Sequence, residues 1–342
     1  MKVTMIGAGG WGTAMVVCLA GRHDDLVLYC RKEETAEQLR QSGENKEYLP
    51  GVRIPRSVKI TSCLETAADG ADVVILATPS KAVKETTEKL LPYLKKEAVV
   101  VCAAKGLADK EGHRLSEVIK DILHDITDRI VVLSGPNHAE EVGKGLPAAT
   151  VAASEVPEAV EIVQDLFMSP VFRVYRSHDI RGVEYGGALK NIIALACGVL
   201  DGLGLGDNSK AALMTRGLVE MTRFGVYFGA KKETFSGLSG MGDLVATCSS
   251  IHSRNHAAGI LLGKGKTAQE ITEGTHMVVE GMRTAVLVNE IAHREHIEMP
   301  VTEEVCKLLK GEHTVAEALD NLMNRAKKAE IETYLEPGES EL

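Results

Sequence analysis

The sequence predicts an α/β fold in which an N-terminal doubly wound sheet is followed by an all-helical C-terminal domain. Its length of 342 residues suits two domains better than one. In the first half, short apolar runs alternate with helical patterns, which is typical of repeated β-α-β units and a parallel sheet. From about Asp179 the periodicity is helical almost throughout. We therefore expect one domain at residues 1–180 and a second at residues 181–342.

The expected strands are short runs rich in β-branched residues, as in strands that are buried on both faces. They are Val3–Ile6, Leu26–Tyr29, Val73–Ala77, Val99–Ala103 and Ile130–Leu133, with further candidates at Ala149–Ala153 and Phe172–Tyr175. Helical patterns cover Thr13–Ala20, Lys81–Leu91 and Arg114–Asp121. In the second half, Gly-rich turns at Asp201–Gly206 and Ser236–Gly242 separate the expected helices.

Composition and charge exclude several classes of protein. The formal net charge of -9 argues against general nucleic-acid binding, which favours a basic surface. The seven cysteines form no CxxC pair, so they indicate reduced thiols in a cytoplasmic protein and neither a disulfide framework nor a metal site. The N-terminal MKVTMIG lacks the pattern of a signal peptide, and the apolar stretch Ile192–Leu200 is too short to span a membrane.

A glycine motif follows the first expected strand. Gly7, Gly9 and Gly12 match the spacing GxGxxG, and a helical pattern begins directly afterwards. In that context the first glycine permits a tight turn, the second lets the backbone approach a pyrophosphate, and the third lets helix and strand pack closely. The free N–H groups of the helix start bind phosphate. The motif therefore predicts a Rossmann-like dinucleotide-binding domain, the alternative being a purely structural turn.

The end of the second expected strand bears on the choice of cofactor. NAD sites usually carry an Asp or Glu there, which binds the ribose 2′-hydroxyl. In this chain Arg31 and Lys32 occupy the region. Because these cations would attract a 2′-phosphate, we expect NADP to be favoured over NAD. The alternative is that the two side chains are an ordinary solvated basic pair.

Two lysines stand in apolar surroundings. Lys105 follows an expected strand, and ligands of open α/β sheets bind at this edge. Lys190 is the only charged residue in the small and apolar stretch Gly186–Leu195. Burial would lower the pKa of Lys190 toward neutrality, as a general acid or base requires. For both residues the alternative is a lysine whose ammonium group reaches water.

Polar residues in the second half complete a candidate site. Asp243 lies in a Gly-rich segment, where it could also be a helix N-cap. Ser253, Arg254 and Asn255 place a hydroxyl, a guanidinium and an amide side by side, although Arg254 could equally be a surface charge. Arginine binds phosphate in a bidentate manner, so this group predicts a phosphorylated substrate beside the nicotinamide.

Ordered segments across the chain resemble bacterial NAD(P)-dependent glycerol-3-phosphate dehydrogenases. The segments are GAGGWGTA (7–14), AAKGL (103–107), SGPNHAEEV (134–142), VEYGGALKNIIALA (183–196), GDNSKAALMTRGL (206–218), LSGMGDLVATC (238–248), HSRN (252–255) and VVEGMRTA (278–285). The resemblance extends from Lys2 to about Arg325. It implies a metal-independent cytoplasmic homodimer that interconverts dihydroxyacetone phosphate and sn-glycerol 3-phosphate, which supplies phospholipid biosynthesis.

The resemblance also implies roles for individual residues. Lys190 is similar to the catalytic proton acceptor of the family, and we expect Asp243 to orient it. The residues that we assign to substrate binding are Lys105, Gly135, Asn137, Lys190, Asn191, Asp243, Ser253, Arg254 and Asn255. Those that we assign to cofactor binding are Gly7, Gly9, Gly10, Trp11, Gly12, Cys30, Arg31, Lys105, Ala139, Arg254, Val278 and Glu280.

Three positions depart from the family pattern. The family commonly has Ser where this chain has Gly10, and Ser or Thr where it has Asn137. Cys30 stands where His or Asn is frequent. Two other functions compete with the dehydrogenase just described. One is a β-hydroxyacid or 6-phosphogluconate-type dehydrogenase, whose substrates carry a carboxylate. The other is a non-catalytic NADP-sensing module, which would need no pair of Lys190 and Asp243.

Overall fold

Eight strands form a single sheet in the computed structural model, which describes residues 1–275, 277–327 and 330. They are β1 (Val3–Ile6), β2 (Leu26–Tyr29), β3 (Lys59–Thr61), β4 (Val73–Leu76), β5 (Val99–Cys102), β6 (Ile130–Ser134), β7 (Ala148–Ala153) and β8 (Phe172–Ser177). Their order in the sheet is β3-β2-β1-β4-β5-β6-β7-β8. The first six strands therefore have the order of a doubly wound dinucleotide-binding fold. Neighbours pair in parallel except β6 and β7, which are antiparallel.

The seven strands that the sequence predicts are confirmed, with ends that differ by at most two residues. Strands β1, β4, β5 and β6 are buried along their whole length, in agreement with their apolar composition. The sequence did not predict β3, because a run of Lys59, Ile60 and Thr61 is short and half polar. Its position is set by parallel pairing with β2 and not by its own pattern.

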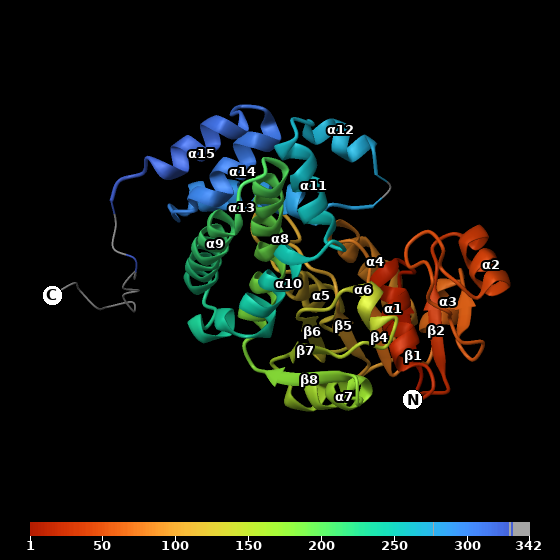
Figure 1. The fold of residues 1–342 in the computed structure, drawn as a ribbon. Coiled ribbons are helices and arrows are strands. Elements are labelled where there is room, and N and C mark those ends of the chain that lie inside the picture. The colour runs from red at the N-terminus through yellow and green to blue at the C-terminus, as the bar shows by residue number, and fades with distance from the viewer. Residues whose placement is uncertain (276, 328–329, 331–342) are drawn as a thin grey trace.

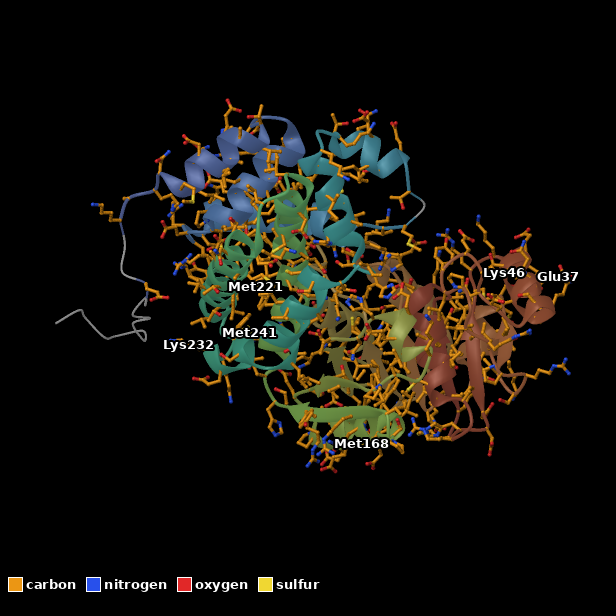
Figure 2. The ribbon with its side chains drawn as sticks, viewed as in Figure 1. Glu37, Lys46, Met168, Met221, Lys232 and Met241 are labelled. Carbon is orange, nitrogen blue, oxygen red and sulfur yellow. The ribbon has the colours of Figure 1, made fainter. Side chains whose placement is uncertain are left out.

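Helices flank the sheet in the first part of the chain (Figure 1). They are α1 (Gly10–Leu19), α2 (Glu33–Ser42), α3 (Leu64–Ala68), η1 (Ser80–Ala82), α4 (Val83–Leu90), η2 (Leu91–Tyr93), α5 (Leu115–Leu123), α6 (Ala139–Val142) and α7 (Pro157–Phe167). The sequence predicted α1, α4 and α5 but not the others. Helix α1 begins at Gly10, so the last three positions of the glycine motif, residues 10–12, already lie in the helix. Figure 2 shows Glu37 on α2 and Lys46 beside it, at one side of the molecule.

The second part of the chain is helical, as predicted. It contains α8 (Ile180–Gly202), α9 (Asp207–Tyr227), η3 (Lys232–Ser236), η4 (Leu238–Gly242), α10 (Asp243–Ser249), α11 (Arg254–Gly263), α12 (Ala268–Glu273), α13 (Glu280–Arg294), α14 (Pro300–Lys310) and α15 (Val315–Met323). Helix α8 lies between α9 and α11 in Figure 1, and Figure 2 shows Met221 among these helices. The predicted turn Ser236–Gly242 is instead mostly η4, a single π-helical turn, and Asp243 is the first residue of α10.

Helix α8 is long and apolar enough to cross a membrane by length and composition. However, 94% of the apolar 18-residue stretch of this helix is buried inside the protein. The neighbouring helices cover it, which is how the central helix of a helical core is placed. The helix is thus longer than the apolar stretch on which the prediction of no membrane span rested.

Glycines allow α8 and α11 to approach closely. A Cβ at Gly198 would collide with the carbonyl oxygen of His256, and a Cβ at Gly259 would collide with that of Leu195. One turn further along, a Cβ at Gly202 or at Gly263 would likewise collide with a carbonyl oxygen of the opposite helix. Small residues at four-residue spacing therefore determine the distance between the two helices that carry Lys190 and Arg254.

The sheet and the helical part meet between β8 and α8. Strand β8 ends at Ser177, and the side chain of Asp179 caps α8 by accepting a hydrogen bond from the backbone N–H of Gly182, 2.9 Å away. The division into domains at residues 1–180 and 181–342 stays a prediction. Its last residues, 331–342, lie outside the described part of the chain.

Candidate active site

The glycine motif forms a tight loop at the carboxyl end of β1. Gly7 has a φ of +114°, and a Cβ there would lie 2.9 Å from the carbonyl oxygen of Ala77, which follows β4. A Cβ at Gly12 would collide with the carbonyl oxygen of Gly7, whereas Gly9 faces open space. The loop therefore lies in the crevice between β1 and β4, the position at which dinucleotides bind in this fold.

The start of α1 has the features of a phosphate site. No side chain caps it, and its first turn carries no acidic residue. The side-chain nitrogen of Trp11 and the hydroxyl of Thr78, near the same loop, are buried without a hydrogen-bond partner in the described structure. Uncapped N–H groups at a helix start attract anions. The loop and its surroundings thus fit the pyrophosphate of a dinucleotide.

Gly10 explains one departure from the family pattern. A Cβ at this position would lie only 2.7 Å from the carbonyl oxygen of Tyr48 and 3.7 Å from the Cβ of Ala139. A serine would therefore require the segment around Tyr48 to move. The structure brings Gly10 and Ala139 together, as expected for two residues that contact one cofactor.

Asn45, which the sequence did not single out, holds this segment on the glycine loop. It is 3% exposed, and its amide donates to the carbonyl oxygen of Ala8 (2.9 Å) and the hydroxyl of Thr13 (2.8 Å). Its own oxygen accepts from the backbone N–H of Tyr48 (3.2 Å). An isolated Asn in a polar loop carries no local pattern that would have revealed this contact.

The residues after β2 differ in exposure. Cys30 is buried, and this burial raises the pKa of its thiol to about 11, so it carries no charge at neutral pH. Arg31 and Lys32 are exposed. The nearest carboxylate in sequence, Glu33, accepts hydrogen bonds from Arg40 and Ser62. The basic pair is therefore open to solvent, and the adjacent carboxylate is already engaged.

Asp243 joins two lysines from distant parts of the chain. Its Oδ1 lies 2.5 Å from Nζ of Lys190, and its Oδ2 lies 2.6 Å from Nζ of Lys105. Lys190 also donates to the hydroxyl of Thr247 (2.6 Å), and Lys105 donates to the carbonyl oxygen of Gly135 (2.9 Å). Each ammonium thus has two partners among the described residues and one N–H left for a ligand.

Burial and charge act together on these groups. Burial is the largest influence on Lys190 and, with the repulsion of Lys105, lowers its pKa to about 8 against the attraction of Asp243. Asp243 is buried as well, yet the two ammonium groups beside it hold the pKa of its carboxyl below the usual value. At neutral pH the Asp is ionised and Lys190 is a protonated acid with a pKa close to the working range.

Close backbone contacts place these side chains. A Cβ added at Gly186 of α8 would lie 2.6 Å from the carbonyl oxygen of Ser239. A Cβ added at Gly187 would lie 2.5 Å from the hydroxyl oxygen of Ser134. Helix α8 is therefore pressed against both η4 and the end of β6. Thr247 lies one helical turn after Asp243 in α10, so the i, i+4 spacing could have indicated it.

The cluster Ser253–Asn255 lies at the start of α11. Ser253 is buried and caps the helix by accepting from the backbone N–H of His256 (3.2 Å). Asn255 donates to Oδ1 of Asn191 (2.9 Å) and accepts from the backbone N–H of Gly281 (2.8 Å), so it links three helices. Arg254 is exposed and makes no hydrogen bond or ion pair with another described residue. Of the three, only Arg254 presents a wholly unengaged side chain.

The remaining predicted residues lie at the border of the two parts. Asn137 donates to the carbonyl oxygens of Ala149 (2.9 Å) and Pro136 (3.0 Å), so its amide is occupied by the loop itself. Val278 is half-buried and lies two residues before α13. Glu280 accepts from the backbone N–H (2.9 Å) and the hydroxyl (2.7 Å) of Ser80, which follows β4. Glu280 is therefore within reach of the nucleotide edge of the sheet.

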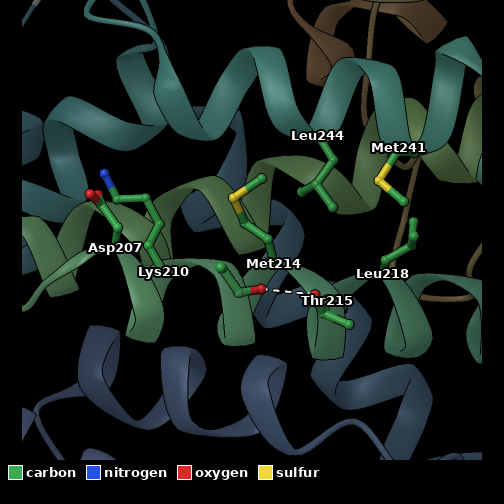
Figure 3. A pocket seen from close by; sticks show the side chains of 8 residues that line it. Asp207, Lys210, Met214, Thr215, Leu218, Met241 and Leu244 are labelled. Atoms are coloured by element: carbon green, nitrogen blue, oxygen red, sulfur yellow. Dashed lines mark hydrogen bonds between the residues drawn. The ribbon is translucent and has the colours of Figure 1, made fainter.

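Two hollows lie near these residues. One, of about 560 Å³, is lined by Pro136, His138, Glu141, Pro147, Ala148, Ala149, Ala246, Ser249, Ser250, Ile251 and His252. It adjoins Asn137 and Ser253 in sequence. The other, of about 320 Å³, is a largely apolar groove between α9 and α10 lined by Asp207, Lys210, Ala211, Met214, Thr215, Leu218, Met241 and Leu244 (Figure 3). None of its lining residues belongs to the predicted site.

Comparisons with known proteins cover nearly the whole chain. Residues 2–160 match the model of the NAD-dependent glycerol-3-phosphate dehydrogenase N-terminus, and residues 179–320 match that of its C-terminus. A glycerol-3-phosphate dehydrogenase [NAD(P)+] from Moorella thermoacetica is 50% identical over 97% of this chain and 98% of its own length. The Bacillus subtilis enzyme of that name is 44% identical over 100% of this chain and 99% of its own.

A solved structure agrees with these relatives. The crystal structure of glycerol-3-phosphate dehydrogenase from Coxiella burnetii is 34% identical and superposes with a TM-score of 0.90, covering 95% of this chain and 99% of that one. A D-mandelate dehydrogenase with NADH, 15% identical at a TM-score of 0.60, shares the fold alone. The family models for the N-terminal and C-terminal parts and the relatives of nearly equal length all indicate the same family. The chain belongs to the NAD-dependent glycerol-3-phosphate dehydrogenase family.

Proposed function

We propose that this protein reversibly transfers a hydride between NAD(P)H and dihydroxyacetone phosphate, giving sn-glycerol 3-phosphate. The observation that carries the proposal is the buried Asp243 between Lys105 and Lys190, each lysine with one N–H that no described residue accepts. A ketone that is reduced needs a proton donor for its oxygen and a cation that holds the rest of the molecule. The site offers both at the sheet edge that carries the glycine loop.

The chain's own residues supply the acid. Lys190 is a protonated amine whose third N–H points to the substrate's carbonyl oxygen in our proposal, and it gives up that proton as the oxygen gains charge. Asp243 and Thr247 hold its other two N–H groups, so the direction of the third is set before substrate binds. In the reverse direction neutral Lys190 removes the hydroxyl proton. The nicotinamide cofactor, when bound, supplies or accepts the hydride.

The substrate's phosphate is assigned to the start of α11. Arg254 is exposed there and has no partner among the described residues, and the first N–H groups of a helix add to its attraction for an anion. Lys105 is assigned to a substrate oxygen near Gly135. Asn137, Asn191, Ser253 and Asn255 already hold structural hydrogen bonds, and we propose that they complete the pocket mainly by shaping it.

For the cofactor we propose NADPH as the better reductant. Residues Gly7, Gly9, Gly10, Trp11 and Gly12 would hold the pyrophosphate, with Cys30, Ala139, Val278 and Glu280 around the rest of the dinucleotide. Arg31 is exposed and the adjacent Glu33 is engaged by Arg40 and Ser62, which supports recognition of a 2′-phosphate. We further propose a cytoplasmic homodimer that supplies glycerol 3-phosphate to phospholipid synthesis, as the family's properties suggest.

A steady-state assay tests this proposal. Reduction of dihydroxyacetone phosphate with NADH and NADPH in parallel should proceed with both cofactors and at least as well with NADPH. A β-hydroxyacid or a phosphogluconate, tested as the oxidisable substrate, should give no turnover. Turnover of a carboxylate substrate alone would favour the rival dehydrogenase, and cofactor binding without any turnover would favour a sensing module.

A further inference from the structure

The backbone beside Lys105 has a conformation that favours glycine. Lys105 lies in the connection between β5 and α5, and the next residue, Gly106, has a φ of +155°. A Cβ at Gly106 would lie 2.7 Å from the Cβ of Ser80, so the loop passes very close to the turn after β4. Nζ of Lys105 must nevertheless reach both Gly135 and Asp243. Such a loop needs contacts that restrain its backbone.

Arg283, one turn into α13, provides such contacts. Its half-buried guanidinium donates from Nη1 to the carbonyl oxygen of Leu107 (2.6 Å) and from Nη2 to that of Ala108 (2.8 Å). Nη1 also lies 3.2 Å from the hydroxyl of Ser80, which is bonded in turn to Glu280. A single side chain thus joins α13, the turn after β4 and the loop after β5.

We propose that Arg283 is a positioning residue that holds Lys105 against Asp243 by fixing the two carbonyl groups that follow it in the loop. The inference rests on the proposed role of Lys105 in substrate binding. The planar guanidinium suits this task, because its two terminal nitrogens can grip adjacent carbonyl oxygens in one fixed geometry. Burial of Leu107 and its β-bridge to Arg114 also hold this loop, so loss of Arg283 should displace Lys105 without unfolding the loop.

Helix α13 also contains a matched control. Arg294 donates from Nη1 to the carbonyl oxygen of Lys110 (3.2 Å) and from Nη2 to that of Glu111 (3.0 Å). It therefore grips the same loop from the same helix and with the same chemistry, but further from Lys105 and at a more exposed position. Comparing Arg283→Met with Arg294→Met separates the restraint on Lys105 from general anchoring of the loop.

The experiment measures kcat and KM for dihydroxyacetone phosphate at saturating NADPH, the Kd of NADPH by its fluorescence, and Tm. Arg283→Met should lower kcat/KM at least ~10-fold, and Arg294→Met should change it less than about 2-fold. In a Lys105→Met background, Arg283→Met should add less than about a further 2-fold, because residues that act through one group are not additive. Arg283→Lys, which keeps a donor, should fall between the wild type and Arg283→Met.

Three outcomes would overturn the inference. They are equal effects of Arg283→Met and Arg294→Met, an undiminished effect of Arg283→Met when Lys105 is already absent, and a loss explained wholly by the Kd of NADPH. If Arg283→Met does not fold, the same comparison is made with Arg283→Lys. Normal activity of Lys105→Met would instead overturn the proposed role of Lys105, and the inference with it.

Discussion

Lys190 is the residue to which we assign the proton transfer. Its side chain is buried, and its neighbours include Lys105, the buried Cys248 and the half-buried His138. The carboxylate of Asp243 opposes the loss of its charge. Burial lowers the pKa of His138, so the imidazole adds little positive charge at neutral pH. The pKa of Lys190, about 8, places its titration within the range of ordinary assays.

The rate should therefore depend on pH with opposite signs in the two directions. Because the protonated amine is the acid, dihydroxyacetone phosphate reduction should fall as pH rises through about 8, and glycerol 3-phosphate oxidation should rise.

Lys190→Ala should lower kcat at least ~10²-fold and still bind NADPH. Thr247→Val removes a hydrogen bond that the charged amine of Lys190 donates, so it should shift the pH dependence of both rates to lower pH. Near-normal kcat in Lys190→Ala would disprove the assignment.

Arg254 should discriminate between phosphorylated and unphosphorylated substrates. Arg254→Ala should weaken the use of dihydroxyacetone phosphate by roughly 1.5–3 kcal/mol, the contribution of charged hydrogen bonds, and affect dihydroxyacetone little. Arg254→Lys keeps the charge but loses the planar fork, so it should remain impaired. The ratio of kcat/KM for the two substrates is the measurement. An unchanged ratio in Arg254→Ala would mean that Lys105 or another group holds the phosphate, and NADPH affinity is measured separately.

Arg31 should read the 2′-phosphate of the cofactor. Arg31→Ala should raise the KM for NADPH more than that for NADH, because only NADPH carries the additional charge. Arg22→Ala is a suitable control, since Arg22 binds the backbone of Phe167 and Met168 far from the glycine loop. Equal changes in the two KM values in Arg31→Ala would show that this side chain does not distinguish the cofactors.

At the scale of elements, the closeness of α8 and α11 is the main structural requirement of the site. Helix α8 carries Lys190 and Asn191, and α11 carries Arg254 and Asn255. Asn255 and Asn191 can bond at 2.9 Å because Gly198 and Gly259 let the backbones touch. A change of helix separation should thus affect catalysis as well as stability.

Gly259→Ala tests this requirement. The added methyl would collide with the carbonyl oxygen of Leu195, and overpacking of this kind typically costs about 1–3 kcal/mol. We expect a lower free energy of unfolding and a reduced kcat/KM, because the helices must separate. Ala257→Ser, which adds an atom on the exposed face of α11, should leave kcat/KM unchanged and lower the free energy of unfolding by only about 0.5 kcal/mol. Equal behaviour of the two variants in denaturation and kinetics would contradict the prediction.

At the scale of the whole molecule, a buried ion pair links the sheet to the helical part. Glu184 of α8 accepts from Nη1 of Arg114 (2.7 Å), from the backbone N–H of Ser116 (3.0 Å) and from its hydroxyl. Arg114 and Ser116 flank the start of α5, which covers the sheet. Because Lys190 lies six residues after Glu184 in α8, this contact also helps to place Lys190 relative to the sheet.

Removing one partner of this pair should be costly. Glu184→Ala leaves the buried Arg114 with the partly exposed Glu117 as its one carboxylate among the described residues, and loss of one partner of a buried pair typically costs about 3–5 kcal/mol. Chemical denaturation should show this loss. Glu155→Ala removes an exposed pair with Lys120 and should cost no more than about 1 kcal/mol. A loss in Glu184→Ala as small as that control would show that the pair does not stabilise the joint.

Much of this molecule was determined by local patterns in the sequence. The glycine spacing after an apolar strand, the alternation of strands and helices and the later helical periodicity predicted the sheet, its loop and the helical part. These signals are local because backbone turns and buried faces need particular residue types at fixed spacings. Segments without such signals were missed, among them β3, whose position depends on its neighbour, and η4, whose glycines suggested only a turn.

The tertiary structure alone decided which side chains meet. Sequence reasoning named Lys105, Lys190 and Asp243, but only the packing of α8 against η4 and β6 brings both ammonium groups to one carboxylate. It also revealed Asn45 and Arg283, whose partners are backbone carbonyls at Ala8, Leu107 and Ala108. A backbone carbonyl is the same in every residue, so a contact to one leaves no mark in the sequence on the side that accepts it.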